Sequence, residues 1–312
     1  MRVIAASLVA GVAVTAAAPA RDASASARRR AGPGAARFDR RTPLPTLIAA
    51  LRAREATTRI AAAAALGARG PKAAAAVPAL AAAMRDPDAR VGLAVGEALG
   101  RIGAPAMPHL LAVFRSNDPA LQAYASAGLG HADASAVPAL AGATHDPQAR
   151  VRIAAVTTLG GLGARARPAL ATLHSLLRDP SDEIRACALG ALARIDPDPI
   201  PTLTAALADS SPQVRWTAAD LLRDRGRDAA PARPALVRAL ADPDAHVRVS
   251  AATALGRVGD DTAVAALRVS LDDSDAAVRS SAARALAALG ASTASPSPSP
   301  APGGSPLLEK SP

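Results

Sequence analysis

The hydrophobic positions between Arg233 and Asp261 have a helical spacing and predict two short helices joined by a turn. In the first helix, Pro234 falls in the opening turn, where its missing N–H is not needed. Apolar residues then recur at spacings of one, three and four: Leu236, Val237 and Leu240. The second helix has a similar stripe, formed by Val247, Ala251, Ala252 and Leu255. One such pair cannot bury its own apolar face, but stacked copies can.

Polar residues and glycine mark the ends of the two helices. Asp242 and Pro243 lie between them, and we expect Asp242 to cap the second helix, with Pro243 as its first residue. Gly259 follows the second helix, and we expect it to adopt the left-handed conformation of a C-cap.

The same unit recurs along most of the chain at steps of 30 to 33 residues. Its opening signal, Pro-x-Leu, occurs seven times, and an eighth copy has Ala265 in place of the proline; the prolines are Pro45, Pro78, Pro108, Pro138, Pro168, Pro201 and Pro234. The aspartate of the turn recurs as Asp86, Asp118, Asp146, Asp179, Asp209, Asp242 and Asp273. A regular two-helix repeat of this kind predicts an all-α fold, an α–α superhelix of about eight repeats over residues 42–290.

The pattern Asp-Pro-x-x-x-Val-Arg, followed by Ala-Ala-x-x-Leu-Gly-x-x-Gly, resembles HEAT-repeat proteins, in particular the short-repeat type related to the phycobilin lyase subunits. Gly92 and Gln122 depart from it by replacing the arginine. Asp242 and Arg248 are six residues apart, so they do not face each other on one helix, but an arginine can reach the aspartate of the next repeat. The resemblance implies that these residues form a structural ladder.

The two ends of the chain have other compositions. Residues 1–20 combine Arg2, an apolar run and small residues, which predicts a cleaved secretory signal or, alternatively, an N-terminal membrane anchor. Residues 21–41 are rich in arginine and predict a flexible basic linker, whereas residues 291–312 are rich in Pro and Ser and predict a disordered tail. Half of the net charge of +10 lies in the linker.

The repeats contain no pattern that predicts catalysis or a cofactor. The five histidines lie at unrelated positions without a partner at metal-binding spacing. No His-Glu dipeptide occurs, which disfavours the two-iron site of the HEAT-like deoxyhypusine hydroxylases. Cys187 is the only cysteine and cannot form an internal disulfide. We therefore expect no metal, no cofactor and no catalytic residue.

In HEAT proteins the second helices line the concave face, so we compared equivalent positions in these helices. Three residues after the Val of Val-Arg stand mostly small residues: Ala61, Ala94, Tyr124, Ala154, Cys187, Thr217, Ser250 and Ser281. Three further on, charge and size vary as on an exposed surface: Ala64, Glu97, Ala127, Thr157, Gly190, Asp220, Thr253 and Arg284. We expect a partner to contact Glu97, Tyr124, Thr157, Asp220, Ser250, Thr253 and Arg284.

The two large aromatic residues of these helices have separate interpretations. Tyr124 is either an anchor for a partner or fills a gap left by Gly128. Trp216 belongs to an apolar row with Ile60, Leu93, Ile153 and Val249, so we expect it in the core.

Three functions remain open from the sequence. The first is a non-enzymatic scaffold, exported or anchored facing the outside through residues 1–20, that binds a protein partner. The second, implied by the resemblance, is a bilin lyase-like subunit acting on a chromophore protein. The third is a HEAT-like nucleic-acid binder, which the four scattered aromatics and the absence of a basic stripe in the compared rows disfavour.

Overall fold

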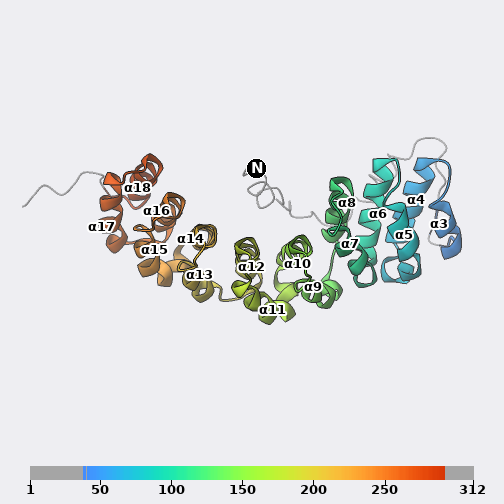
Figure 1. Ribbon diagram of the computed structural model, residues 1–312, viewed down its shortest axis with the longest axis horizontal. Coiled ribbons are helices and arrows are strands. Elements are labelled where there is room, and N and C mark those ends of the chain that lie inside the picture. The colour runs from blue at the N-terminus through green and yellow to red at the C-terminus, as the bar shows by residue number, and fades with distance from the viewer. Residues whose placement is uncertain (1–37, 40, 292–312) are drawn as a thin grey trace, which may run out of the picture. The chain divides into compact units, whose positions relative to one another are not determined.

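The computed structural model describes residues 38–39 and 41–291, and this part of the chain is all-α, as predicted (Figure 1). Its α-helices form eight consecutive pairs, and in every pair the first helix is shorter than the second. The predicted signal or anchor at residues 1–20, most of the basic linker and nearly all of the Pro/Ser tail lie outside the described residues.

The pairs belong to two compact units, and the first ends at Pro199. It contains five pairs: α3 (Leu44–Ala50) with α4 (Ala56–Gly67), α5 (Val77–Ala83) with α6 (Ala89–Ile102), α7 (Met107–Val113) with α8 (Pro119–Leu129), α9 (Val137–Ala143) with α10 (Ala149–Leu162), and α11 (Leu170–Ser175) with α12 (Asp182–Ile195). Second helices pack on one another, α4 on α6, α6 on α8 and α10 on α12. Short 3-10 turns connect the pairs, among them η4 (Gly163–Ala169), and η5 (Leu176–Arg178) extends the first helix α11.

The second unit begins at Ile200 and contains three pairs. These are α13 (Ile200–Ala206) with α14 (Pro212–Arg225), α15 (Arg233–Ala239) with α16 (Ala245–Val258), and α17 (Asp261–Val269) with α18 (Ala276–Ala288). The second helices again stack, α14 on α16 and α16 on α18. The 3-10 turn η6 (Gly226–Ala232) joins α14 to α15.

The core is built from the two apolar stripes of the repeat. The leucine of the Pro-x-Leu signal, or of Ala-x-Leu in the last pair, is fully buried in seven of the eight pairs: Leu47, Leu80, Leu110, Leu140, Leu203, Leu236 and Leu267. In the fifth pair the predicted Leu170 is only half-buried, and Leu173, about one turn later, is the fully buried leucine. In the second helices the Val of Val-Arg is buried in the same way, for example Val151, Val214 and Val247. Each pair therefore buries its apolar residues against its own partner helix and the neighbouring pair, as the period predicted.

The expected cap of the second helix is wrong by two residues. Asp244, not Asp242, caps α16, and its carboxylate accepts hydrogen bonds from the backbone N–H groups of His246 and Val247 at 2.8 and 3.3 Å. Asp88 and Asp275 cap their helices in the same way. Asp118 does cap α8 as the sequence predicted, because it is equivalent to Asp88 and Asp244, whereas Ser116 is equivalent to Asp242. Pro243 consequently precedes the helix, because the carboxylate of Asp242 is held by other partners.

The left-handed conformation expected at Gly259 is also wrong. Gly259 has φ −76° and ψ 169°, an extended conformation. The equivalent glycines that end other second helices do have positive φ, for example 82° at Gly103 and 56° at Gly226. The difference arises because Asp260 directly caps the next helix, α17, with no 3-10 turn between the two helices. In the described part of the chain, no helix is both long enough and apolar enough to cross a membrane.

Candidate binding face

The residues predicted to contact a partner all lie on second helices. We call one row of these helices the second-helix face; it consists of Ala64, Glu97, Ala127, Thr157 and Gly190 in the first unit and of Asp220, Thr253 and Arg284 in the second. No member of this row is buried, whereas Ser250 and Ser281 of the neighbouring row are buried, at 9% and 2% exposed. The central row is thus the accessible one, and the row that includes Ser250 lies largely between adjacent second helices.

The ring of Tyr124 packs on the preceding second helix. It is half-buried and covers Gly92 of α6 so closely that a Cβ at Gly92 would lie 2.4 Å from its Cε2 atom. The space that Tyr124 fills is therefore left by Gly92, and not by Gly128 as the sequence suggested. Gly128 instead lies against the backbone of Gly96, with 2.5 Å from a built Cβ to its carbonyl oxygen.

Trp216 lies between the core and the surface. It is half-buried and packs against Ala239, Val247 and Ala251 of the next repeat. The other members of its row are not fully buried either, and Leu93 is 43% exposed. The expectation that Trp216 belongs to the core therefore holds only for one side of its ring.

The two carboxylates of the central row are each paired with an arginine of their own helix. Glu97 lies 3.1 Å from Arg101, one turn further along α6. Asp220 lies 2.8 Å from Arg223 on α14. Burial raises the pKa of Asp220 above its ordinary value, although the charge of Arg223 and a hydrogen bond with Ser250 act in the opposite direction. The carboxylates are thus oriented by their neighbours before any partner binds.

The remaining predicted residues differ in their exposure and in the hydrogen bonds of their side chains. Thr157 is exposed, and no contact of its side chain within the described residues is recorded. Thr253 is half-buried and donates its hydroxyl hydrogen to the carbonyl of Val249 at 2.8 Å. Arg284 is exposed and donates to Ser281 at 3.0 Å. Thr157 and Arg284 are therefore the groups of this row most available to a partner.

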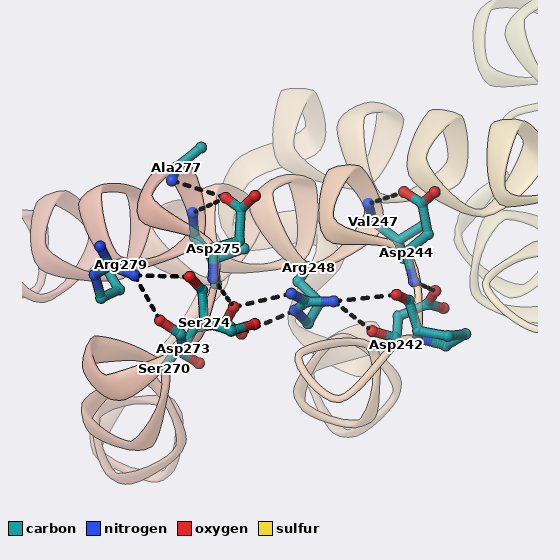
Figure 2. Close-up of polar contacts among 12 residues, drawn as sticks. Asp242, Asp244, Val247, Arg248, Ser270, Asp273, Ser274, Asp275, Ala277 and Arg279 are labelled. Carbon is teal, nitrogen blue, oxygen red and sulfur yellow. Dashed lines mark hydrogen bonds and ion pairs between the residues drawn. The ribbon is translucent and has the colours of Figure 1, made fainter.

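The recurrent arginines and aspartates form the ladder that the resemblance implied. Arg248 lies between two aspartates of successive repeats (Figure 2), with its Nε 2.8 Å from Asp273 Oδ2 and its Nη1 2.9 Å from the carbonyl oxygen of Asp242. Asp242 in turn receives two hydrogen bonds from Arg215, both 2.7 Å long. The same rung joins Arg59 to Asp86, and a longer ion pair of 3.4 Å joins Arg152 to Asp179.

This ladder explains why the turn aspartates that pair with an arginine, such as Asp242, do not cap helices. Asp242 Oδ1 accepts the backbone N–H of Asp244 at 2.9 Å and holds the turn while it pairs with Arg215. Such a rung is a charge-assisted, bidentate contact between side chains that are about nine-tenths buried, at 12% and 9% exposed. The ladder is structural, and its repetition makes it unsuited to a single catalytic site.

The ladder is interrupted between the second and third pairs. Gly92 replaces the arginine and Ser116 replaces the aspartate, and here the ring of Tyr124 packs on Gly92. One step later, Gln122 donates to the carbonyl of Ser116 at 2.6 Å, and Asp146 is paired with Arg115 from the end of α7. Between the second and third pairs, therefore, close packing of α6 on α8 replaces the ion pair.

Within residues 38–39 and 41–291, no cluster of three His, Cys, Asp or Glu side chains is arranged to hold a metal ion. Burial raises the pKa of the Cys187 thiol to about 11, and the charge of Glu183 adds to this effect. A thiol of this kind is a poor nucleophile at neutral pH.

Comparisons with known proteins agree on the fold. The family model described as HEAT repeats matches residues 44–118, 107–193, 170–237 and 233–297. No curated protein matches the sequence. Among solved structures, a mutant of Kap121p is similar at 14% identity, with a TM-score of 0.56, over 81% of this chain and 34% of that protein.

Two further structures are less similar. An engineered protein has 21% identity and a TM-score of 0.41, covering 81% of this chain and 79% of that one. Human deoxyhypusine hydroxylase in complex with glycerol has 23% identity and a TM-score of 0.36, covering 79% of this chain and 96% of that one. The repeated family match over most of the chain, together with the eight consecutive helix pairs, shows that this protein belongs to the HEAT-repeat family.

Proposed function

We propose that this protein is a non-catalytic scaffold that binds a protein partner on its second-helix face. The observation that carries the proposal is a contrast between two rows of the same repeat. Each of the eight pairs buries a leucine of its first helix, at the same repeat position in seven pairs and one turn later, at Leu173, in the fifth. By contrast, no residue of the central row of the second-helix face is buried, and this row changes among Ala, Gly, Thr, Glu, Asp and Arg. Packing explains the uniform row, and recognition of a partner explains exposed residues that differ from repeat to repeat.

The charges of this face favour recognition by oriented polar groups over a purely apolar contact. Glu97 and Asp220 are held by Arg101 and Arg223, so each presents a carboxylate in a fixed position. Side chains that are already ordered lose less conformational entropy when a partner binds. Trp216 and Leu93, each partly exposed, add apolar area beside these groups.

The test uses paired variants of the full chain. Thr157→Arg and Arg284→Glu alter exposed positions of the second-helix face without touching the ladder. The matched control, Ala205→Arg and Arg238→Glu, makes equivalent changes at exposed positions of the first helices α13 and α15. Affinity capture from cell extract is expected to lose a protein with the face variant and to retain it with the control. Equal recovery with both variants, at equal thermal stability, would refute the assignment of this face.

We also propose that the protein is exported or anchored to a membrane through residues 1–20. The support is the sequence of these residues, an apolar run after Arg2 with small residues at Ala18-Pro19-Ala20. Mass spectrometry of the protein purified from its native source tests this. A mature chain starting near Arg21, or an intact chain in the membrane fraction, fits the proposal, and an intact chain free in the cytoplasm contradicts it.

A further inference from the structure

A row of cationic residues runs along a second surface of the first unit, at the turn inside each repeat. Each member stands two residues after the end of a first helix or, in the fifth pair, at the end of η5. We call this row the basic edge: Arg52, Arg85, Arg115, His145 and Arg178, one from each of the five pairs, and all of them exposed.

The ends of the first helices do not require these cations. A positive charge near a helix C-terminus stabilises the helix dipole by about 0.3–1 kcal/mol, which is a structural reason for one arginine. In the second unit, however, the same position holds Ala208, Ala241 and Asp272, and the first helices there form equally well. The cations are therefore a property of one unit and not of the repeat.

Most of the basic edge is free to bind an anion. For the side chains of Arg52, Arg85 and Arg178, no hydrogen bond or ion pair is recorded within residues 38–39 and 41–291. The neighbouring ladder aspartates do not neutralise them, because Asp86 is already paired with Arg59 and Asp179 with Arg152. Two members of the row are engaged within the described residues: Arg115 pairs with Asp146, and His145 Nδ1 lies 3.1 Å from the hydroxyl of Thr144.

The same edge contains a hollow between the fourth and fifth pairs. Its volume is about 400 Å³, and both His145 and Arg178 line it. The Arg152–Asp179 rung forms part of its wall, and a second hollow beside it shares Arg178 and Ser175. Asp146 and Asp179 also line the hollow, but each is already paired with an arginine, Asp146 with Arg115 and Asp179 with Arg152. A carboxylate placed here therefore meets the side chains of Arg178 and His145 as donors.

We propose that the basic edge binds an extended acidic segment of a protein partner, with one acidic side chain in the hollow lined by His145 and Arg178. Packed helices lie about 8–10 Å apart, and an extended chain advances about 3.3–3.6 Å per residue. Acidic residues at every third position of the segment are therefore spaced at about the same distance as the cations of successive repeats.

A nucleic acid fits this edge less well. Its phosphates follow one another at about 3.4 Å along each strand of a duplex, which is much denser than one cation per repeat. The five residues of the edge include no Phe, Tyr or Trp, and the imidazole of His145 is a single ring, so successive bases lack a stacking platform. This surface is separate from the second-helix face, so the two proposals stand or fall independently.

The experiment measures binding of a fluorescent peptide of about fifteen residues, with Glu at every third position, by fluorescence anisotropy. The edge variant of the full chain is Arg52→Gln, Arg85→Gln and Arg178→Gln. The matched control, Arg165→Gln, Arg167→Gln and Arg227→Gln, removes the same charge from exposed positions of η4 and η6 that have no recorded partner. Both variants retain the arginines of residues 21–41, so the difference between them isolates the edge.

We expect the edge variant to bind the peptide at least about tenfold more weakly than the unaltered protein, a change of about 1.4 kcal/mol. The control is expected to change the affinity less than about threefold, or about 0.6 kcal/mol. Equal losses in both variants, no loss in the edge variant, or no binding by the unaltered protein would overturn the proposal. Tighter binding of an oligothymidylate of equal charge, lost in the edge variant, would assign the edge to nucleic acid and also overturn it.

Discussion

The contact between α6 and α8 gives the most direct test of how this fold is held together. Gly96 lies where the two helices approach closely, and a Cβ there would stand 2.2 Å from the carbonyl oxygen of Tyr124 and 2.8 Å from its carbonyl carbon. Both atoms belong to the backbone, so no side-chain rotation can relieve the clash. Gly96→Ala therefore forces the two helices apart by about 1.2 Å, the difference between 2.2 Å and an ordinary contact of 3.4 Å.

The expected cost follows from two opposing effects. Overpacking of a tight contact by one methyl group costs about 1–3 kcal/mol. Alanine is the better helix former, which returns about 1 kcal/mol in the interior of a helix. Gly96→Ala is thus expected to destabilise the protein by about 1 kcal/mol, the middle of the resulting range.

Gly190 of α12 supplies the matched control. It also lies inside a second helix, but a Cβ there meets nothing within 4 Å. Gly190→Ala gains the helix propensity without the clash and is expected to stabilise the protein by about 1 kcal/mol. The two substitutions are chemically identical, so their difference of about 2 kcal/mol isolates the contact between the helices.

Urea unfolding followed by far-ultraviolet circular dichroism measures this difference. Repeat arrays need not unfold in a single step, so the midpoint of each transition is compared before any free energy is fitted. Gly96→Ala should lower the midpoint and Gly190→Ala should raise it. If Gly96→Ala stabilises the protein as much as Gly190→Ala does, the backbones of α6 and α8 are not in close contact and the reasoning is wrong.

Three further predictions concern other contacts. Gly92→Ala should destabilise the protein when Tyr124 is present and should be neutral or stabilising in a Tyr124→Ala background, which a double-mutant cycle in urea measures. Hydrogen bonds from Arg59 hold the pKa of Asp86 below its usual value, so this rung stabilises the protein above about pH 4 and its contribution is lost as the pH falls through the lower folded pKa. Asp86→Asn should then lower the free energy of unfolding by about 1.5–3 kcal/mol at neutral pH. It should also make the free energy of unfolding fall less steeply as the pH is lowered below about 4. Cys187 should react with a thiol reagent much faster in urea than in the folded protein at pH 7, and equal rates would contradict its burial.

The sequence by itself determined the period and the composition of the core. Leu236 and Val247 repeat at helical spacing, and both are fully buried where the pattern placed them. The six-residue separation of Asp242 and Arg248 also excluded a contact on one helix and left the next repeat as the partner, as observed. These features depend on residues within one or two helical turns of each other, so they can be read from the order of the chain.

Tertiary structure decided which polar group serves which purpose. Asp242 and Asp244 are both suited to capping. Because Arg215 of the preceding repeat donates hydrogen bonds to Asp242, Asp242 belongs to the ladder and Asp244 caps the helix. Likewise, Tyr124 is placed by the absence of a side chain at Gly92, which lies on another helix. Such choices depend on the distance between two backbones that pack together, and local sequence preferences do not set that distance.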